Sequence, residues 1–402
     1  MEHITDDLPA PRLGDRGLFP DLEAAVYLNH AAISPPSRRI QRALHACIAT
    51  YAARGVEAFF TYNQQRAELR QDLAALLGAD AGEIALTSGT SAGVIDVALC
   101  FPWRAGDRVV LFDGEFPANI TPWQRAAAAF DLRTTLLPLE DYMRSHAPGL
   151  ERLEATLRAG GVRLVAVSSV QFRTGLRMPI REIAALCREH GAELFVDAIQ
   201  GCGATPLDVE ADGIDYLACG GHKHLMGVEG AGFLYVRQAR AAALRPNVAG
   251  WLSHEEPVGF LVQGPGHLRY DRPIRQRADM VEAGGWNALG HAALGAAVKV
   301  TLGLGVEAIH AHVAAYLDAL EPALRERGFR SLRHPDPAGR STLLCVLPPE
   351  GRDVVALHRA LGARGVASSI PDGVLRFAPH WPNSQGELPT LLAAIDAALA
   401  DA

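Results

Sequence analysis

Between residues 83 and 236 the sequence alternates short apolar segments with longer segments of helical periodicity. Short apolar segments rich in β-branched residues predict strands, and the segments between them predict helices. The expected strands are 83–87, 108–112, 132–137, 162–170, 193–196, 213–218 and 232–236. Because these strands do not alternate apolar and polar residues, we expect an α/β fold with a mostly parallel seven-stranded sheet, covered on both faces. Such sheets bind ligands at the carboxyl ends of their strands.

The pattern changes after about Gly250. A loop with many glycines and prolines is followed by two long helical patterns and then by a shorter mixture of strands and helices, which predicts a smaller α+β domain. We therefore expect three parts, namely an N-terminal arm over 1–21, a large ligand-binding domain over 22–265, and a small C-terminal domain over 266–402 that packs with the arm.

Composition excludes several classes of protein. The chain has 402 residues and a net charge of −7, which argues against nucleic acid as a partner. It has no apolar run of 18 residues and no apolar leader near Met1, so we expect neither a membrane span nor a secretory signal. Six scattered cysteines without a Cys-x-x-Cys motif predict free thiols in a reducing compartment, which is typically the cytoplasm.

Lys223 is one of only two lysines, and it follows the expected strand 213–218 in the turn Gly220-Gly221-His222-Lys223. Glycines permit tight, positive-φ turns, which suit a lysine held against a ligand. A lysine amine is the side chain that condenses readily with an aldehyde cofactor. Taken alone, a surface lysine in a loop is the more common explanation.

Two further stretches are typical of binding sites for a ligand that carries a phosphate group and an aromatic ring. Thr90 and Ser91 open a helix, where backbone N–H groups and hydroxyls can bind phosphate, although both residues are also common helix caps. Asp197 ends an apolar strand, and a buried carboxylate there needs a partner such as a pyridinium nitrogen, unless it caps the next turn. Gln200 could donate to a phenolic oxygen on the same ring.

Two more residues lie near strand ends. Phe116 follows the expected strand 108–112 and could lie flat on a planar cofactor, or it could be a core residue. Arg376 lies inside an apolar strand and needs an anion, either a substrate carboxylate or an internal salt-bridge partner.

Taken together, these stretches resemble the class V aminotransferase family, the pyridoxal-phosphate enzymes that include cysteine desulfurases, kynureninases and isopenicillin-epimerase-like proteins. The motifs that carry the resemblance span most of the chain: Tyr27-Leu28-Asn29-His30-Ala31-Ala32, Thr87-Ser88-Gly89-Thr90-Ser91, Glu115-Phe116-Pro117-Ala118-Asn119, Val196-Asp197-Ala198-Ile199-Gln200, Gly221-His222-Lys223 and Arg376-Phe377-Ala378-Pro379.

The resemblance implies a type I pyridoxal-phosphate fold and a homodimer with its site at the subunit interface. Lys223 would bind the cofactor covalently and move protons, Asp197 and Gln200 would hold the ring, and Phe116 would stack on it. The phosphate would be bound by Thr90, Ser91 and His222. A partner subunit usually adds a Glu-x-Gly-Thr motif, which here reads Glu282-Ala283-Gly284-Gly285, so that only the Gly285 backbone remains. Substrate contacts are assigned to Asn29, His30, Gln171, Trp251 and Arg376.

The reaction is less constrained. The segment before Arg376 is too short for a mobile cysteine loop and Cys345 lies in a strand, so the sequence argues against a cysteine desulfurase. Gln171 and Trp251 lie in kynureninase-like stretches. We expect transamination of a free α-amino acid, with a C–S or C–C lyase and a non-catalytic cofactor-binding protein as alternatives. His222 and His224 are too few for a metal site, and no Gly-x-Gly-x-x-Gly or Gly-Lys sequence supports a dinucleotide or P-loop site.

Overall fold

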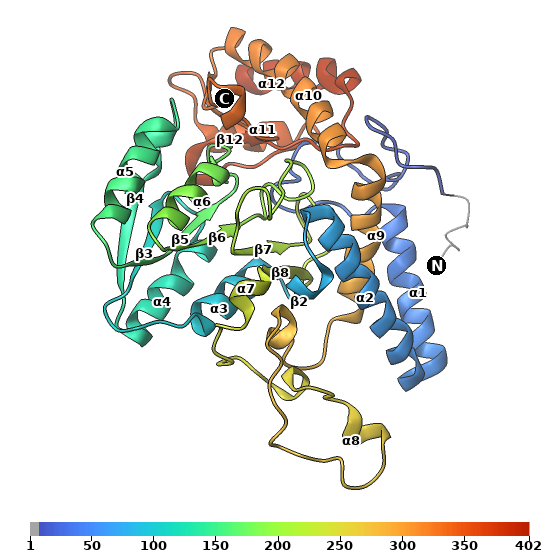
Figure 1. The fold of residues 1–402 in the computed structure, drawn as a ribbon. Helices are drawn as coiled ribbons and strands as arrows, with labels where there is room; N and C mark the ends of the chain where they lie inside the picture. The colour runs from blue at the N-terminus through green and yellow to red at the C-terminus, as the bar shows by residue number, and fades with distance from the viewer. Residues whose placement is uncertain (1–7, 402) are drawn as a thin grey trace.

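The computed structural model describes residues 8–401, so the first seven residues of the expected arm lie outside the described part. A seven-stranded sheet forms the centre of the molecule (Figure 1), in the order β2-β8-β7-β6-β5-β3-β4. The strand β8 runs antiparallel to the other six strands, which are parallel to one another. The predicted α/β class and the mostly parallel sheet are confirmed. Its strands are β2 (Ile84–Thr87), β3 (Arg108–Asp113), β4 (Arg133–Pro138), β5 (Val162–Ser168), β6 (Glu193–Asp197), β7 (Tyr216–Gly220) and β8 (Gly232–Val236).

The two faces of the sheet bury alternate residues of the same strands. On one face, Val110 and Val196 belong to a core cluster shared with α2 (Ala58–Leu77), α5 (Ala147–Arg158) and α6 (Ile180–Glu189). On the other face, Val109 and Phe195 pack with α3 (Thr90–Cys100) and α4 (Thr121–Phe130). Because successive side chains in a strand point to opposite faces, a strand that is apolar throughout must be covered twice, as expected from its sequence.

A second core lies at the C-terminal end of the chain. It is built on a three-stranded antiparallel sheet and includes Leu18 and Phe19 of the expected arm. The elements here are β9 (Arg330–Ser331), β10 (Leu344–Leu347), β12 (Leu375–Phe377), α10 (Val306–Glu326), α11 (Val354–Gly362) and α12 (Leu388–Asp401), and β1 (Val26–Tyr27) pairs separately with β11 (Val366–Ala367).

One helix joins the two cores. The helix α9 (Ala288–Leu304) packs along α1 (Arg38–Arg54) and α2. Its Leu294 belongs to the core of the large sheet, whereas its Val300 belongs to the second core. The expected division at residue 265 stays a prediction. Among the described residues no single helix is long and apolar enough to cross a membrane, and α9 with α10 reaches that length only as a pair bent by 77°.

A segment near residues 254–275 projects from the body, at the bottom of Figure 1. It contains the four-residue helix α8 (Gly259–Val262), while α7 (Gln238–Ala241) precedes it on the body of the protein. Several large apolar side chains of this segment are exposed, namely Phe260, Leu261, Val262, Leu268 and Tyr270.

Candidate active site

The carboxyl ends of five strands place the expected site residues at one edge of the sheet. The chain leaves β7 into the Lys223 turn, β6 ends at Asp197, and β3 is followed by Phe116. The end of β5 leads to Gln171, and β2, which runs parallel to β7, leads to Thr90 at the start of α3. Parallel strands end at the same edge, so residues far apart in sequence converge there.

The Lys223 turn is fixed by backbone contacts. Gly221 N–H donates to Ala231 O at 2.8 Å, and Gly227 N–H donates to Gly221 O at 2.7 Å. A Cβ at Gly221 would lie 2.9 Å from a Leu294 methyl and 3.0 Å from Ala231 O. Glycine is therefore required for close approach. The flanking glycines do not use the positive φ that they permit; within the turn the left-handed residue is Met226, with φ 58°.

The Lys223 amine lies 5.4 Å from the centre of the Phe116 ring. Burial lowers the pKa of Lys223 to about 8, an effect that Arg376 adds to and Asp197 opposes. Lys299 on the surface pairs with Glu68 at 3.7 Å, whereas no carboxylate within residues 8–401 forms an ion pair with Lys223. Phe116 is 45% exposed, so the alternative that it is a core residue was wrong.

Asp197 is 2% exposed, and its Oδ1 accepts a hydrogen bond from Ile199 N–H at 3.0 Å. It therefore does cap the following turn, but no cation in the described chain pairs with it. Burial raises the pKa of Asp197 to about 6, while the Ile199 N–H and Lys223 act in the opposite direction. A buried carboxylate in this state gains most from a ligand that presents a cationic N–H.

The amide of Gln200 is oriented by two protein contacts. Its Nε2 donates to Ala31 O at 3.0 Å, and its Oε1 lies 3.3 Å from His224 Nε2. Burial lowers the pKa of His224 well below its usual value, so the ring is neutral and can donate from Nε2. The amide nitrogen of Gln200 keeps a second N–H for a ligand.

The N-terminus of α3 is open to an anion. Its cap is Gly89, which provides no side chain, and the buried Thr90 Oγ1 has no partner within the described chain. The alternative that Thr90 or Ser91 is the helix cap was therefore wrong. A Cβ at Gly232 would lie 2.7 Å from Gly89 Cα and 3.1 Å from Gly220 Cα, so this helix start lies beside the strand end that carries His222. Ser91 is exposed, so its hydroxyl is accessible to a phosphate.

Arg376 is 5% exposed, and its guanidinium donates to Ser369 Oγ at 3.1 Å and to Phe172 O at 2.8 Å. No acidic side chain in the described chain forms an ion pair with it, so the alternative of an internal salt bridge was wrong. Its register partner across the sheet is Cys345, whose thiol pKa burial raises to about 12. The buried cation is left to bind an external anion.

Sequence analysis missed a buried network beneath the site. Glu115 accepts hydrogen bonds from the backbone N–H and the hydroxyl of Ser168 and, at 3.0 Å, from Gln171 Nε2. Burial raises the pKa of Glu115 to about 7, and these bonds act against the shift. Gln171 Oε1 is buried and has no partner among residues 8–401. The position of Glu115 directly after a strand and beside Phe116 was the available signal.

The remaining predicted residues fall into two groups. His30 is buried, and its Nδ1 lies 2.8 Å from Ser34 Oγ, which donates to Lys223 O. Asn29 Oδ1 is buried and has no partner in the part of the chain that the structure describes. Trp251 contacts Phe260 of the projecting segment, and Gly285 lines a separate cavity with Ser88. Within the described chain, His30 is thus linked to Lys223 through Ser34, whereas Gly285 lies with Ser88 and Ala92 beside the start of α3. No three His, Cys, Asp or Glu side chains of the described chain are arranged to hold a metal ion.

Comparison with known proteins identifies the family. The family model for aminotransferase class V matches residues 26–370. The chain belongs to this family. The predicted family, its pyridoxal-phosphate cofactor and its general activity on an amino acid are confirmed by that membership.

Two curated relatives and one solved structure show the range of the similarity. The uncharacterized aminotransferase YcbU of Bacillus subtilis is 28% identical over 390 residues, which are 96% of both chains. A probable cysteine desulfurase of Pyrococcus abyssi is 26% identical over 94% of this chain and 95% of its own. The cystine C–S lyase C-DES, solved with its reaction product cysteine persulfide, is 24% identical, covers 94% of this chain and 98% of its own, and has a TM-score of 0.84. This last match shows the shared fold.

The exclusion of a cysteine desulfurase was wrong. Full-length relatives carry that function in their names, and so do solved structures of the same fold. The sequence argument relied on a short segment before Arg376, and the length of one loop does not decide between members of a family that align over nearly the whole chain.

Proposed function

We propose that this class V protein is a pyridoxal-phosphate-dependent enzyme that breaks the C–S bond of a sulfur-bearing amino acid such as cysteine or cystine. The observation that carries the amino-acid chemistry is the half-buried Lys223 amine, which shares its surroundings with a buried carboxylate, Asp197, and a buried unpaired guanidinium, Arg376. The names of the relatives support the choice of sulfur substrates.

The residues present fit the cofactor. The partnerless Thr90 Oγ1, the uncapped start of α3 and His222 would hold the phosphate. Asp197 would accept the ring N–H, Gln200 would donate its free N–H to the ring oxygen, and Phe116 would cover one face of the ring. Bound there, pyridoxal phosphate supplies an electron-accepting ring.

The substrate would be oriented by Arg376, whose fork matches an α-carboxylate. The buried Asn29 Oδ1 and Gln171 Oε1 need donors, and a substrate can supply them. Lys223 would remove the α-proton in its neutral form, and the low pKa makes that form available near pH 8. In the elimination reaction, cysteine and one water would give pyruvate, ammonia and hydrogen sulfide.

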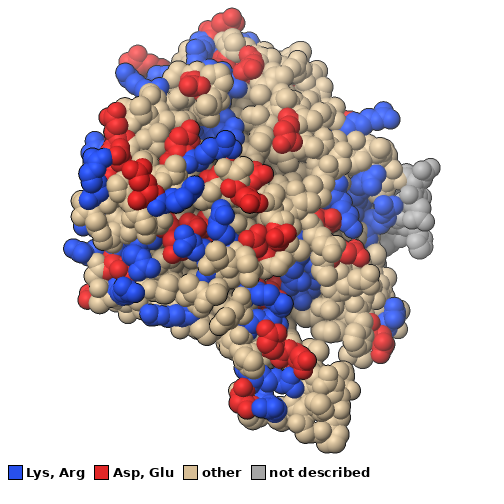
Figure 2. Space-filling view, viewed as in Figure 1, with Lys and Arg blue, Asp and Glu red and all other residues tan. Residues whose placement is uncertain are grey.

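We also propose a homodimer. Large exposed apolar side chains occur on α1, α2, α3 and α9 and on the projecting segment, including Ile48, Phe60, Ile95, Leu289 and Leu261. Figure 2 shows charges of both signs mixed over the face in view, without a field of one sign that would oppose association. A second subunit could bring its own Trp251 and Gly285 to the site. Sedimentation velocity tests this: the proposal requires a dimer at micromolar concentration, and a monomer would contradict it.

The six cysteines are buried and unpaired in the described chain, which supports our proposal of a reducing compartment, the cytoplasm. Fractionation of cells that express the full chain tests the location, and recovery outside the cytoplasm would contradict it.

The activity is tested by incubating cofactor-loaded protein with cysteine and with cystine, and by measuring sulfide, pyruvate, alanine and ammonia. If the protein cleaves the C–S bond, the wild type releases sulfur and a variant without Lys223 does not. Transamination is the second candidate, because the relative YcbU is named an aminotransferase. It predicts a 2-keto acid and a newly aminated acceptor without sulfur release, and that result would contradict the proposal.

A further inference from the structure

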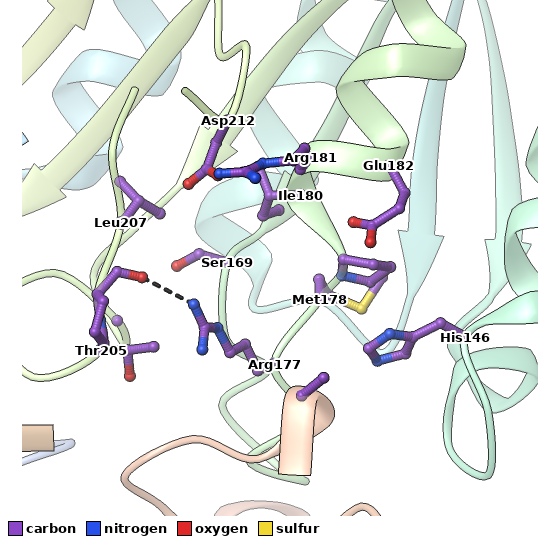
Figure 3. Close-up of a pocket in the computed structure, with 14 residues that line it drawn as sticks. His146, Ser169, Arg177, Met178, Ile180, Arg181, Glu182, Thr205, Leu207 and Asp212 are labelled. Atoms are coloured by element: carbon purple, nitrogen blue, oxygen red, sulfur yellow. Dashed lines mark hydrogen bonds and ion pairs between the residues drawn. The ribbon is translucent and has the colours of Figure 1, made fainter. Parts of the chain in front are cut away.

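A cavity of about 290 Å³ lies beside the active-site turn but outside the active site. Gly201, which follows Gln200, forms part of its wall, as does Ser169 at the end of β5. Lys223, Asp197 and Phe116 do not line it. In Figure 3, Arg177 and Ser169 stand between Thr205 and Leu207 on one side and Glu182 and His146 on the other. The chain from Arg177 into the first turn of α6 therefore forms one side of a separate polar chamber.

Arg177 brings to this cavity a cation that has no ion-pair partner in the described chain. Its Nη2 donates to Pro206 O at 3.0 Å, which uses one of five N–H groups. No carboxylate in the described chain forms an ion pair with it. Burial lowers its pKa, and Asp212 and Glu182 oppose this change. An arginine guanidinium is charged at neutral pH in proteins.

Hydroxyl and amide donors surround the same space. Ser169 Oγ and Thr205 Oγ1 belong to residues that are each 4% exposed, and neither oxygen has a partner in the described chain. The ten-residue helix α6 begins at the cavity, and its cap Pro179 offers no side-chain acceptor to the free N–H groups of the first turn. A guanidinium, two hydroxyls and a helix N-terminus are the donors that bind a carboxylate.

The opposite wall carries the complementary charge. Glu182 is exposed, and its carboxylate forms no hydrogen bond or ion pair with the rest of the described chain, whereas Asp212 is occupied by Arg181 at 3.2 Å. His146 also faces the cavity. Burial and His334 lower its pKa, and its buried Nε2 has no partner among the described residues. A simple anion would be repelled by the carboxylate of Glu182, and a simple cation would be repelled by the guanidinium of Arg177.

We propose that this cavity binds a free α-amino acid as a zwitterion. Its carboxylate binds Arg177 and the two hydroxyls, its ammonium group binds Glu182, and a small side chain packs on Met178, Ile180 and Leu207. The site is separate from the catalytic one, and the inference does not depend on the reaction proposed above. Because Gly201 lines this cavity and directly follows Gln200, an occupant contacts the segment that carries Gln200.

Binding is measured by titration calorimetry on the full chain with Arg376→Met, which removes the carboxylate contact of the catalytic site. We expect at least one amino acid to bind at one site per chain. Adding Arg177→Met should weaken that binding about tenfold or more, the equivalent of roughly 1.4 kcal/mol. Adding Arg158→Met, which breaks only an exposed helix pair with Glu154, should leave it unchanged.

Thr205→Val, which keeps the shape of the side chain, provides a second variant in case Arg177→Met disturbs folding; it should also weaken binding. Acetate, inorganic phosphate and ethylamine serve as partial ligands, and each should bind at least about tenfold more weakly than the best amino acid. Acetate or phosphate binding equally well, no amino acid binding, or binding unchanged by both Arg177→Met and Thr205→Val would each overturn the proposal. Sulfur release by the wild-type protein is a separate measurement, so the failure of one proposal does not imply the failure of the other.

Discussion

His224 Nε2 lies 3.3 Å from Gln200 Oε1, so the residue after the active-site lysine orients the amide that faces the expected cofactor ring. His224 is fully buried beside His380, whose ring centre lies 5.7 Å away. The neutral His224 ring donates from Nε2 to Gln200 Oε1, which fixes the side of the amide that carries the oxygen. The N–H groups of Gln200 therefore point to the other side, where Ala31 O accepts one of them. This contact assigns a positioning role to His224.

His224→Leu should therefore weaken cofactor binding by about 1 kcal/mol, the size of one hydrogen bond, and change the pH at which the visible band of the bound cofactor titrates. Titration of cofactor-free protein with pyridoxal phosphate measures both. His224→Gln, which can donate from a similar place, should restore much of the wild-type titration. A band that titrates identically in wild type and His224→Leu would refute the positioning role.

Arg376→Met should lower kcat/KM for an amino-acid substrate, with a loss of transition-state stabilisation of about 2–5 kcal/mol. The reason is that the substrate carboxylate loses its expected buried cationic partner. The loss should be much smaller for cysteamine, which is cysteine without the carboxylate. Arg364→Met, at a surface pair with Asp401, serves as the matched control. Equal losses for both substrates would show that Arg376 does not bind the carboxylate.

The low pKa of Lys223 sets a pH dependence for the capture of the cofactor. Only the neutral amine attacks an aldehyde, so the rate at which cofactor-free protein captures pyridoxal phosphate should rise with pH to a midpoint near 8. Asp197→Asn removes a charge that raises the pKa and should lower the midpoint. Arg376→Met removes a charge that lowers the pKa and should raise it. Stopped-flow absorbance measures the rate, and a midpoint near 10 in the wild type would be inconsistent with burial of the amine.

Glu282 provides a test of stability. It is 9% exposed and accepts hydrogen bonds from Arg66, from Arg70 at 2.6 Å and from Leu86 N–H at 2.8 Å. Glu282→Gln leaves two guanidinium groups without their anion and should lower the free energy of unfolding by about 3–5 kcal/mol. Urea denaturation measures the loss. Glu154→Gln, in an exposed pair with Arg158, should cost less than about 1 kcal/mol. Similar losses in both variants would argue against a special role for the buried cluster.

The sequence predicted those parts of the fold that local patterns determine. Strands such as β5 and β6 are recognisable because burial on two faces requires apolar residues at every position. The residues at the strand ends follow from the same logic, which brought Asp197, Phe116 and Lys223 to one edge. The contact of His224 with Gln200 and the buried Glu115 could not be predicted in this way, because they depend on packing between distant segments. The projecting segment around Phe260 was predicted only as a loop.

The central claim is that the amine of Lys223 binds the cofactor covalently, and the second lysine of the chain makes a direct test possible. Cofactor-loaded protein is reduced with borohydride, digested and analysed by mass spectrometry, with Lys223→Ala and Lys299→Ala treated in parallel. We predict a pyridoxyl group on Lys223 alone in wild type and in Lys299→Ala. Lys223→Ala should carry none and should lose the absorbance band at roughly 410–430 nm. A band retained in Lys223→Ala, or a label found on Lys299, would contradict the account.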